Sequence, residues 1–505
     1  MNAVILTGGT GTALRMLAAR PDLRLFAETG GKNATVVTAL SDRELAIKHV
    51  VRSSFSHSGQ KCSATSLLLL EAEVYDDPEF KRVLCDAVKS LHVGSAWELA
   101  TRVGPLIRPP EGELEVALKT LGPGESWAVW PRQVGENPRL WSPGVKYGVR
   151  PGSDTHRIEF FGPLLGVMRF EGLDEAIALV NETGYGLTSG LHSLDEREHG
   201  QWKAGIRAGN LYVNRGTTGA MVLRQPFGGW GRSSFGPGLK AGGPNYVAQF
   251  MNFDEAETGE PSDAPLTNPD LESLRCALVE LTGAILSLSN GPGQTDTRAE
   301  RFSSWLPALL PSLQACSAAI QQALASYDAW WNAEFAAAHD HFKLLGQDNF
   351  RRYQPLAEIR VRIAPADSLF DVFARAGAAR VTGARVVISS PPGLESGAVR
   401  LLDELTDSWA AAIEFLEETD EQLAANLRAM APHAEERIRY AAPGRVPASV
   451  RAASASAGVY LADEPVRRQG RLELLWYVRE QSVSDDYHRY GNLGRRAIEA
   501  RRQPT

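Results

Sequence analysis

The stretch at residues 55–64, FSHSGQKCSA, constrains the fold of this chain most strongly. A helical pattern with a polar cap covers residues 42–54 before it, and a short apolar run covers residues 67–70 after it. Farther along, residues 71–150 alternate between strand and helix patterns that are separated by Gly/Pro turns. This alternation predicts an α/β fold with a parallel sheet, in which Cys62 lies in the loop that follows a helix.

Two carboxylates accompany the cysteine: Glu28, in AETGGKNA, and Glu159, in EFFGPLLG. A cysteine thiolate attacks carbonyl carbons, and a nearby carboxylate can take a proton from the water that hydrolyses the acyl-enzyme. We expect a helix start near Cys62 and the neighbouring Lys61 to lower the pKa of the thiol. His57 is predicted to be a turn-forming surface residue. The competing interpretation makes Cys62 a small buried apolar residue.

These three stretches, and the intervals between them, resemble the aldehyde dehydrogenase superfamily, whose motifs are E-x-GGK, GQ-x-C and E-x-FGP. The resemblance implies an aldehyde dehydrogenase-like catalytic domain that uses NAD. It implies that Cys62 is the nucleophile and Glu28 the general base. It also implies that Glu159 binds the nicotinamide ribose and that Phe161 packs on the nicotinamide ring.

The start of the chain holds a strand pattern at residues 3–6, the glycine-rich turn TGGTGT at residues 7–12 and then a helical pattern. Such a turn leaves backbone N–H groups free for a phosphate, although most turns of this kind are ordinary βα loops. The turn is similar to a segment of the family that lies along the dinucleotide. The resemblance therefore assigns cofactor contacts to Thr7, Gly8, Gly9 and Thr10.

The resemblance begins in the middle of the family's sequence. Residues 1–29 are therefore interpreted as a remnant of the NAD-binding domain, and residues 30–253 as the catalytic domain. Most of the NAD-binding half is expected upstream in the same gene product or in a partner chain. That half includes an Asn that helps to stabilise the oxyanion and the region that discriminates NAD from NADP, so this choice stays open.

Residues 209–229, GNLYVNRGTTGAMVLRQPFGG, bear on the substrate. They resemble the glutamate-semialdehyde dehydrogenases, also called Δ1-pyrroline-5-carboxylate dehydrogenases. The resemblance implies that Ser63, Gly219 and Ala220 bind the α-carboxylate of the substrate and that Phe227 lies beside its aliphatic chain. Paired backbone N–H groups without side-chain obstruction suit a small carboxylate. The alternatives are a plain glycine turn and an aldehyde dehydrogenase of another specificity.

The composition changes after residue 253, and the acidic, Pro/Ser-rich residues 254–270 are predicted to be a linker. Residues 271–505 are predicted to form a second, Rossmann-like α/β domain. The predicted helices cover residues 271–288, 302–337, 369–378 and 397–416, and the predicted strands cover residues 359–363 and 384–388.

The end of the chain, residues 470–494, and the earlier stretch HFKLLGQDNFRRY resemble the C-terminal extension of proline utilisation A proteins. The resemblance implies a non-catalytic domain whose tail helps to close a substrate tunnel. It also implies an upstream, FAD-dependent proline dehydrogenase as a partner. We expect His488, Asp485 and Asp486 to be structural.

Several classes of function are disfavoured by composition. The formal net charge is −7 and basic residues are spread along the chain, so no nucleic-acid partner is predicted. The 4 cysteines show no paired spacing, and neither a signal peptide nor a long apolar run is present, which predicts a cytoplasmic protein without a transmembrane segment. We expect no metal ion, and a homo-oligomer is compatible with the sequence.

The predicted function is NAD-dependent oxidation of L-glutamate 5-semialdehyde to L-glutamate in proline catabolism. Two alternatives stay open. One is a catalytically incompetent scaffold or assembly fragment, and the other is an aldehyde dehydrogenase with a different substrate.

Overall fold

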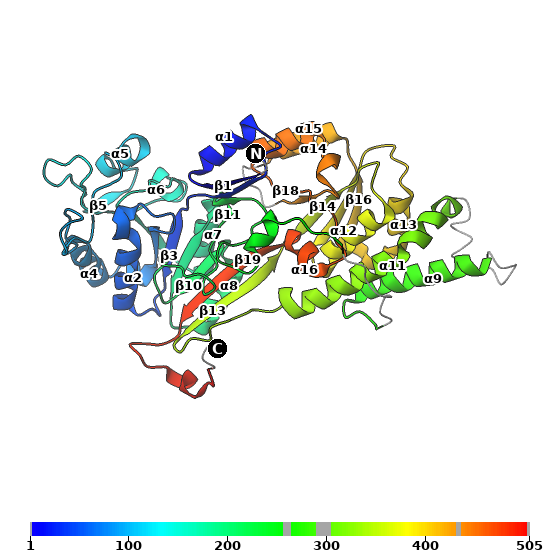
Figure 1. Ribbon diagram of the computed structural model, residues 1–505. Helices are drawn as coiled ribbons and strands as arrows, with labels where there is room; N and C mark the ends of the chain where they lie inside the picture. Colours follow the sequence, from blue (N-terminus) through cyan, green and yellow to red (C-terminus); the bar gives the residue numbers. More distant parts are fainter. Residues whose placement is uncertain (1–2, 256–263, 289–304, 431–435, 502–505) are drawn as a thin grey trace.

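The computed structural model describes residues 3–255, 264–288, 305–430 and 436–501 (Figure 1). Within these ranges the chain forms a nine-stranded sheet, a five-stranded sheet, a three-stranded sheet and a two-stranded ribbon of β8 (Tyr185–Gly186) and β11 (Trp230–Gly231). Helices cover the larger sheets, so the predicted α/β fold class is confirmed.

The small sheet at the start of the chain joins β1 (Val4–Thr7), β2 (Leu25–Glu28) and β12 (Ser234–Phe235). Helix α1 (Thr10–Ala19) connects β1 to β2, as its sequence predicts. Its buried face packs on α15 (Ala448–Ala457), in a cluster that contains Leu17 and Ala455. The first residues are therefore fixed to the second half of the chain.

The nine-stranded sheet carries the stretch around Cys62. Its strands, in spatial order, are β13 (Gln347–Pro355), β19 (Val478–Asp486), β10 (Asn210–Val213), β9 (Thr188–His192), β3 (Asn33–Val37), β4 (Thr65–Glu71), β7 (Leu164–Phe170), β6 (Gly144–Tyr147) and β5 (Ser126–Val129).

Both faces of this sheet are covered, which explains the continuous apolar run in β4. Leu68 and Leu70 point toward α2 (Arg43–Phe55) and α4 (Pro78–Lys89). Leu67 and Leu69 point toward α7 (Leu173–Glu182) and α8 (Glu196–Gly205). Successive side chains of a strand alternate between the two faces, so an inner strand of a covered sheet is apolar throughout. The Asp42 carboxylate accepts a hydrogen bond from the Leu45 N–H at 3.1 Å and confirms the predicted helix cap.

The sheet is mixed, and this corrects the prediction of a parallel sheet. At one edge β5 pairs antiparallel with β6. At the other edge β19 runs parallel to β10, and β13 then pairs antiparallel with β19 over their whole lengths. Two strands from the second half of the chain thus belong to the sheet of the first half, so residue 270 does not separate the two sheets. In Figure 1, β19 and β13 lie beside β10.

The five-stranded sheet is parallel throughout. Its order is β16 (Ile413–Glu417), β15 (Arg385–Ser390), β14 (Glu358–Arg362), β17 (Ile438–Arg439) and β18 (Leu461–Ala462). Because the first strand in sequence lies in the middle and the chain then winds outward on both sides, the predicted Rossmann-like arrangement is confirmed.

The predicted helices of this half are confirmed with one correction. Helix α13 (Gly397–Leu405) ends well before residue 416, and the predicted helix continues instead as a 3-10 turn and strand β16. Residues 256–263 of the predicted linker and residues 302–304 of a predicted helix lie outside the described residues. The remaining helices are α3 (Ala72–Tyr75), α5 (Gly112–Lys119), α6 (Asp154–Arg157), α9 (Pro269–Leu288), α11 (Leu306–Trp330), α12 (Leu369–Val381), α14 (Asp420–Ala429) and α16 (Gly470–Glu473).

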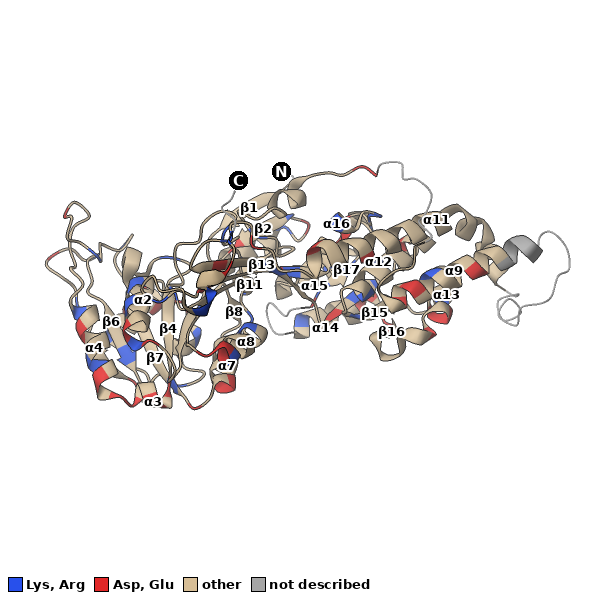
Figure 2. Ribbon diagram, turned by 90° about the horizontal axis from the view of Figure 1, so that it is seen from below, with Lys and Arg blue, Asp and Glu red and all other residues tan. Residues whose placement is uncertain are grey.

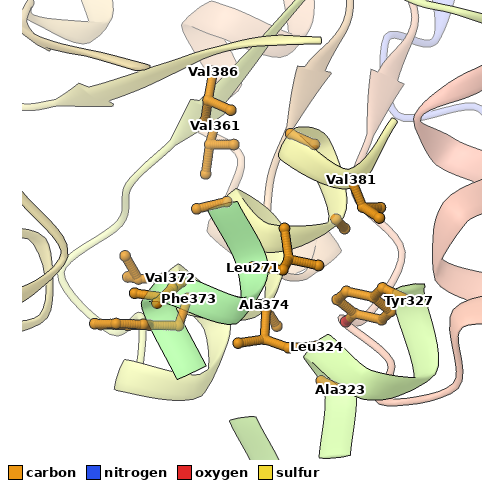
Figure 3. Packing of buried hydrophobic residues seen from close by; sticks show 14 of the residues in the cluster. Leu271, Ala323, Leu324, Tyr327, Val361, Val372, Phe373, Ala374, Val381 and Val386 are labelled. Atoms are coloured by element: carbon orange, nitrogen blue, oxygen red, sulfur yellow. The ribbon is translucent and has the colours of Figure 1, made fainter. Parts of the chain in front are cut away.

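The main core of the second half lies where α9, α11 and α12 meet the five-stranded sheet. Figure 3 shows Leu271, Leu324 and Phe373 from these helices near Val361 and Val386 of the strands. In Figure 2 the two signs of charge are interspersed along the visible side of the molecule. None of the helices in the described ranges combines the length and the apolar character that a membrane span requires.

Candidate active site

Cys62 lies in the turn between α2 and β4, and the side chain of Asn33 holds this turn. The Asn33 Nδ2 group donates to the Cys62 carbonyl at 2.6 Å and to the Ala64 carbonyl at 2.9 Å. Asn33 Oδ1 accepts the Thr188 N–H at 3.0 Å. One buried amide therefore ties the Cys62 turn to β3 and to the neighbouring strand β9. The sequence analysis missed Asn33; its position directly after GGK, at the start of a buried strand, is the signal that could have identified it.

The pKa prediction for Cys62 is wrong. Burial raises the pKa of the thiol, and the negative charges of Glu159 and Glu28 raise it further, whereas the Ser63 N–H and Lys61 lower it. In the described structure no helix begins near Cys62. A short 3-10 turn precedes this residue, and a strand follows it. Burial and the two carboxylates therefore disfavour the thiolate form of Cys62.

Glu28 ends β2, and its carboxylate is buried. Its Oε2 atom is inaccessible to solvent and has no hydrogen-bond partner among the described residues. Burial raises the pKa of Glu28 to about 7, against the opposing effects of Lys240 and the Gly229 N–H. A carboxylate with this proton affinity exchanges a proton readily near neutral pH, as a general base must.

Glu159 explains the two glycines that follow Glu28. The Gly31 N–H donates to Glu159 Oε1 at 2.9 Å, and a Cβ atom at Gly30 would overlap the Glu159 carboxylate. The next residue, Lys32, is only 3% exposed, and burial lowers its pKa to about 7. The GGK motif thus lets the backbone after Glu28 approach the carboxylate of Glu159 closely.

The Cys62 turn and the Glu159 loop contact each other. The Gln60 Nε2 group donates to the Phe161 carbonyl at 3.2 Å, and a Cβ atom at Gly59 would overlap the Gly162 carbonyl. Phe161 has a positive φ of 55° and its side chain is 39% exposed. The structure therefore places Glu159 and Phe161 beside Cys62. His57 is exposed in the 3-10 turn with a φ of 55°, as predicted.

The glycine-rich turn lies against the same site. Thr7 pairs with Glu28 in the small sheet, and the Gly8 N–H donates to the Glu28 carbonyl at 3.1 Å. Gly9 is the N-cap residue of α1, and a Cβ atom there would meet nothing within 4 Å in the described structure. The Thr10 hydroxyl donates to the Arg232 carbonyl at 2.8 Å. The backbone at the start of α1 thus has free space beside it and lies close to Glu28, at the end of β2.

Of the predicted substrate residues, Ser63 lies beside the loop that carries Gly219 and Ala220. The Thr217 hydroxyl donates to the Ser63 carbonyl at 3.1 Å, which joins the loop that carries Gly219 and Ala220 to the residue after Cys62. Gly219 is exposed with a φ of 91°, a conformation that favours glycine. Phe227 is half-buried and exchanges two backbone hydrogen bonds with Ala241.

Strands β13 and β19 support this substrate loop, a role that the sequence analysis did not foresee. The Gln225 Nε2 group donates to Asn349 of β13 and, at 3.3 Å, to the Ser484 hydroxyl of β19. The Ser482 hydroxyl donates to the Pro226 carbonyl at 2.5 Å. Asp485, predicted to be structural, pairs with Lys203 at 2.8 Å. The end of the chain therefore builds part of the wall around the candidate site.

Comparison with known proteins bears on the first half of the chain. Residues 1–255 match the aldehyde dehydrogenase family. The chain is a member of that family. Its first half is similar to two proteins named 1-pyrroline-5-carboxylate dehydrogenase, from Bacillus cytotoxicus (36% identical) and Bacillus thuringiensis (35% identical). Each match covers 230 residues, which are 45% of this chain and 44% of the relative.

A solved structure extends the similarity of this aldehyde dehydrogenase to nearly its whole length. Proline utilisation A (PutA) from Corynebacterium freiburgense is 36% identical with a TM-score of 0.75. The match covers 97% of this chain and 42% of that chain. The chain therefore spans less than half the length of the proteins that it resembles.

Proposed function

We propose that this chain carries out the NAD-dependent oxidation of L-glutamate 5-semialdehyde to L-glutamate in proline catabolism, once an NAD-binding segment completes it. One observation carries the proposal: Cys62, Glu159, the Glu28 segment and the loop of Gly219 are joined by direct hydrogen bonds and close backbone contacts around a single site. The names of the relatives support the substrate class.

The residues of the chain divide the chemistry between them. The Cys62 thiol gives its proton to the Glu28 carboxylate, which releases it to solvent before the hydrolysis step. The sulfur adds to the aldehyde carbon, and the Cys62 N–H, together with an Asn from the completing segment, would hold the oxyanion. NAD, when bound, supplies the acceptor for the hydride that leaves this carbon. Glu28 then takes a proton from the water that hydrolyses the Cys62 thioester, and the product carboxylate and the free sulfur result.

The environment of the site fits the nicotinamide end of such a cofactor. Glu159 offers a largely buried carboxylate, and Phe161 an exposed ring, directly beside the Cys62 turn. At the other end of the site, Thr7, Gly8, Gly9 and Thr10 offer backbone at the start of α1 for the dinucleotide. The strand–helix–strand unit of β1, α1 and β2 is the part of the described structure that we propose for the dinucleotide.

Substrate choice is proposed to rest on the α-carboxylate. Ser63 and the backbone N–H groups of Gly219 and Ala220 would bind it, with Phe227 along the aliphatic chain. The hydrogen bond from Thr217 to the Ser63 carbonyl supports this assignment because it fixes the two segments side by side. The similarity to PutA further suggests an FAD-dependent proline dehydrogenase segment as the source of the substrate, with residues 271–505 as a non-catalytic domain whose tail helps to close a tunnel.

The test uses the chain alone and the chain joined to an upstream NAD-binding segment. The completed protein should form NADH with glutamate semialdehyde, the Cys62→Ala variant should form none, and Glu28→Gln should give a burst of NADH followed by a slow steady state. Ser63→Ala should lower kcat/KM for glutamate semialdehyde and spare an uncharged aldehyde of the same length. A completed, folded and NAD-binding protein without NADH formation would favour the scaffold alternative.

A further inference from the structure

A buried cation lies behind Glu28. Lys240 is 1% exposed, and its Nζ atom donates to the Gly228 carbonyl and, at 3.3 Å, to Asn210 Oδ1. A Cβ atom at Gly209 would overlap both Lys240 Nζ and the Gly228 carbonyl, so the absence of a side chain at residue 209 makes room for the ammonium group. The ammonium group of Lys240 therefore occupies a defined position in the protein interior.

Gly228 lies beside both this lysine and the candidate base. A Cβ atom at Gly228 would lie 3.3 Å from Glu28 Oε1 and 3.5 Å from Lys240 Cγ. Both side chains thus lie on the side of Gly228 where a side chain would project. In a buried environment, a charge on one group strongly affects the proton affinity of the other.

The last strand of the chain supplies a second carboxylate. Glu480 of β19 is fully buried, and its Oε2 accepts the main-chain N–H of Lys240 at 3.0 Å. Its Oε1 accepts from the Asn245 side chain, and its main-chain carbonyl accepts the Trp230 Nε1–H at 3.0 Å. Glu480 therefore fixes the segment between residues 230 and 245 that bears Lys240.

Resting on the function proposed above, we propose that Lys240 and Glu480 are positioning residues that set the proton affinity of the general base Glu28. Lys240 is a buried cation whose charge interacts with both Glu28 and Glu480, so the three groups cannot all be charged without a net negative charge in the interior. Glu28 is then the group that takes up a proton, because its Oε2 atom is buried and has no hydrogen-bond partner among the described residues. Strand β19, which lies outside the part of the chain that matches the family, would thereby tune the chemistry.

The other titratable groups around the three are few. Tyr246 and Cys62 also face Glu28. Arg351 and Tyr353 of β13 lie near Glu480. Burial opposes a charge on each buried member, raising the pKa of Glu480 and lowering that of Lys240 to about 8. These groups are shared by all the variants described next, so they do not affect the comparison.

The experiment titrates Glu28 directly in the full chain. Infrared difference spectra, with Glu28→Gln as the reference, follow the protonated-carboxyl band of Glu28 as the pH changes. The Lys240→Gln variant keeps a hydrogen-bond donor for the Gly228 carbonyl. It should raise the midpoint of the Glu28 titration by about one pH unit, because the nearby positive charge that stabilises the Glu28 carboxylate is removed. Glu480→Gln should lower the midpoint, because the ammonium charge is then no longer divided between two carboxylates.

A second measurement links the titration to chemistry without the cofactor. The thiolate of Cys62 can displace p-nitrophenolate from p-nitrophenyl acetate, and the resulting thioester is hydrolysed by water. The acid limb of the deacylation rate should move with the same opposite signs in Lys240→Gln and Glu480→Gln. Absence of any acetyl group on Cys62 would count against the proposed function, whereas the infrared titration would still test the roles of Lys240 and Glu480.

The matched control is the buried ion pair of Lys146 and Glu125. Lys146 Nζ and Glu125 Oε2 are 3.1 Å apart. Lys146→Gln and Glu125→Gln should reduce stability without moving the Glu28 midpoint. Opposite shifts in the two test variants, confirmed as folded by circular dichroism, support the proposal. Unchanged midpoints, or shifts in the same direction, would overturn it; if Lys240→Gln does not fold, the direction in Glu480→Gln decides.

Discussion

Replacement of Asn33 by alanine tests the account of the Cys62 turn. The substitution removes the amide that donates to the Cys62 and Ala64 carbonyls and accepts from the Thr188 N–H. The Ala64 and Thr188 groups are buried, and a buried polar group left without a partner costs about 1–3 kcal/mol. We therefore expect the free energy of unfolding to fall by about 2–6 kcal/mol.

The assay pairs urea denaturation with the rate of Cys62 alkylation by iodoacetamide. Peptide mapping locates the alkylated residue, because Cys276 is exposed and reacts as well. Release of the turn should expose the thiol and speed its alkylation several-fold. Asn181→Ala is the matched control, since that side chain donates to the Gly205 carbonyl and accepts the Arg207 N–H, both at 2.9 Å, away from Cys62. If both variants lose stability and neither changes the alkylation rate, Asn33 has no specific role at Cys62.

Three further predictions follow from the same geometry. Glu159→Gln should lower the pKa of the Cys62 thiol, because it removes a negative charge that raises it, and the alkylation rate at pH 8 should rise; an unchanged pH profile would contradict this. Gly30→Ala should displace Glu159 and destabilise the protein by calorimetry, whereas Gly9→Ala, with open space at its Cβ position, should not; equal effects would refute the close approach. Burial lowers the pKa of His192 to about 3, so the unfolded chain binds a proton below about pH 6.5 that the folded chain does not, and stability should fall as the pH drops from about 6.5 toward 3. His192→Leu should lose less stability over that interval, and an identical loss in both proteins would rule out this origin of the pH dependence.

The elements that the sequence predicted best are those with strong local patterns. The apolar run in β4, the capped helix α2 and the strand–turn–helix at the start of the chain depend on periodicity and on Gly or Asp at defined positions. The residues near Cys62 also came together as expected, because the motifs lie at the ends of neighbouring strands. Local chemistry was sufficient for these parts.

The errors arise where distant contacts decide the outcome. Residues 406–417 have an alanine-rich helical pattern, yet pairing with β15 makes the end of that stretch a strand. The sequence analysis did not identify Glu480, Ser482 and Ser484 of β19, yet each of these side chains bonds to the loop that borders the site or to its support. Propensity is a weak preference that tertiary pairing overrides.

The pKa of Cys62 illustrates the same limit. Lys61 is adjacent in sequence and suggested a lowered pKa, while burial and the charges of Glu159 and Glu28 act in the opposite direction. Neither carboxylate is near Cys62 in sequence, and the degree of burial depends on the packing of several elements. Sequence order alone therefore gave the wrong sign.

The central claim is that Cys62 forms a thioester which Glu28 helps to hydrolyse. The most direct measurement is mass spectrometry of the Glu28→Gln variant, completed with its NAD-binding segment and quenched after exposure to glutamate semialdehyde and NAD. The account predicts a glutamyl adduct on the peptide that contains Cys62, accumulating in Glu28→Gln and absent from Cys62→Ala. A variant that forms NADH without an adduct on Cys62, or that carries the adduct on another residue, would contradict it.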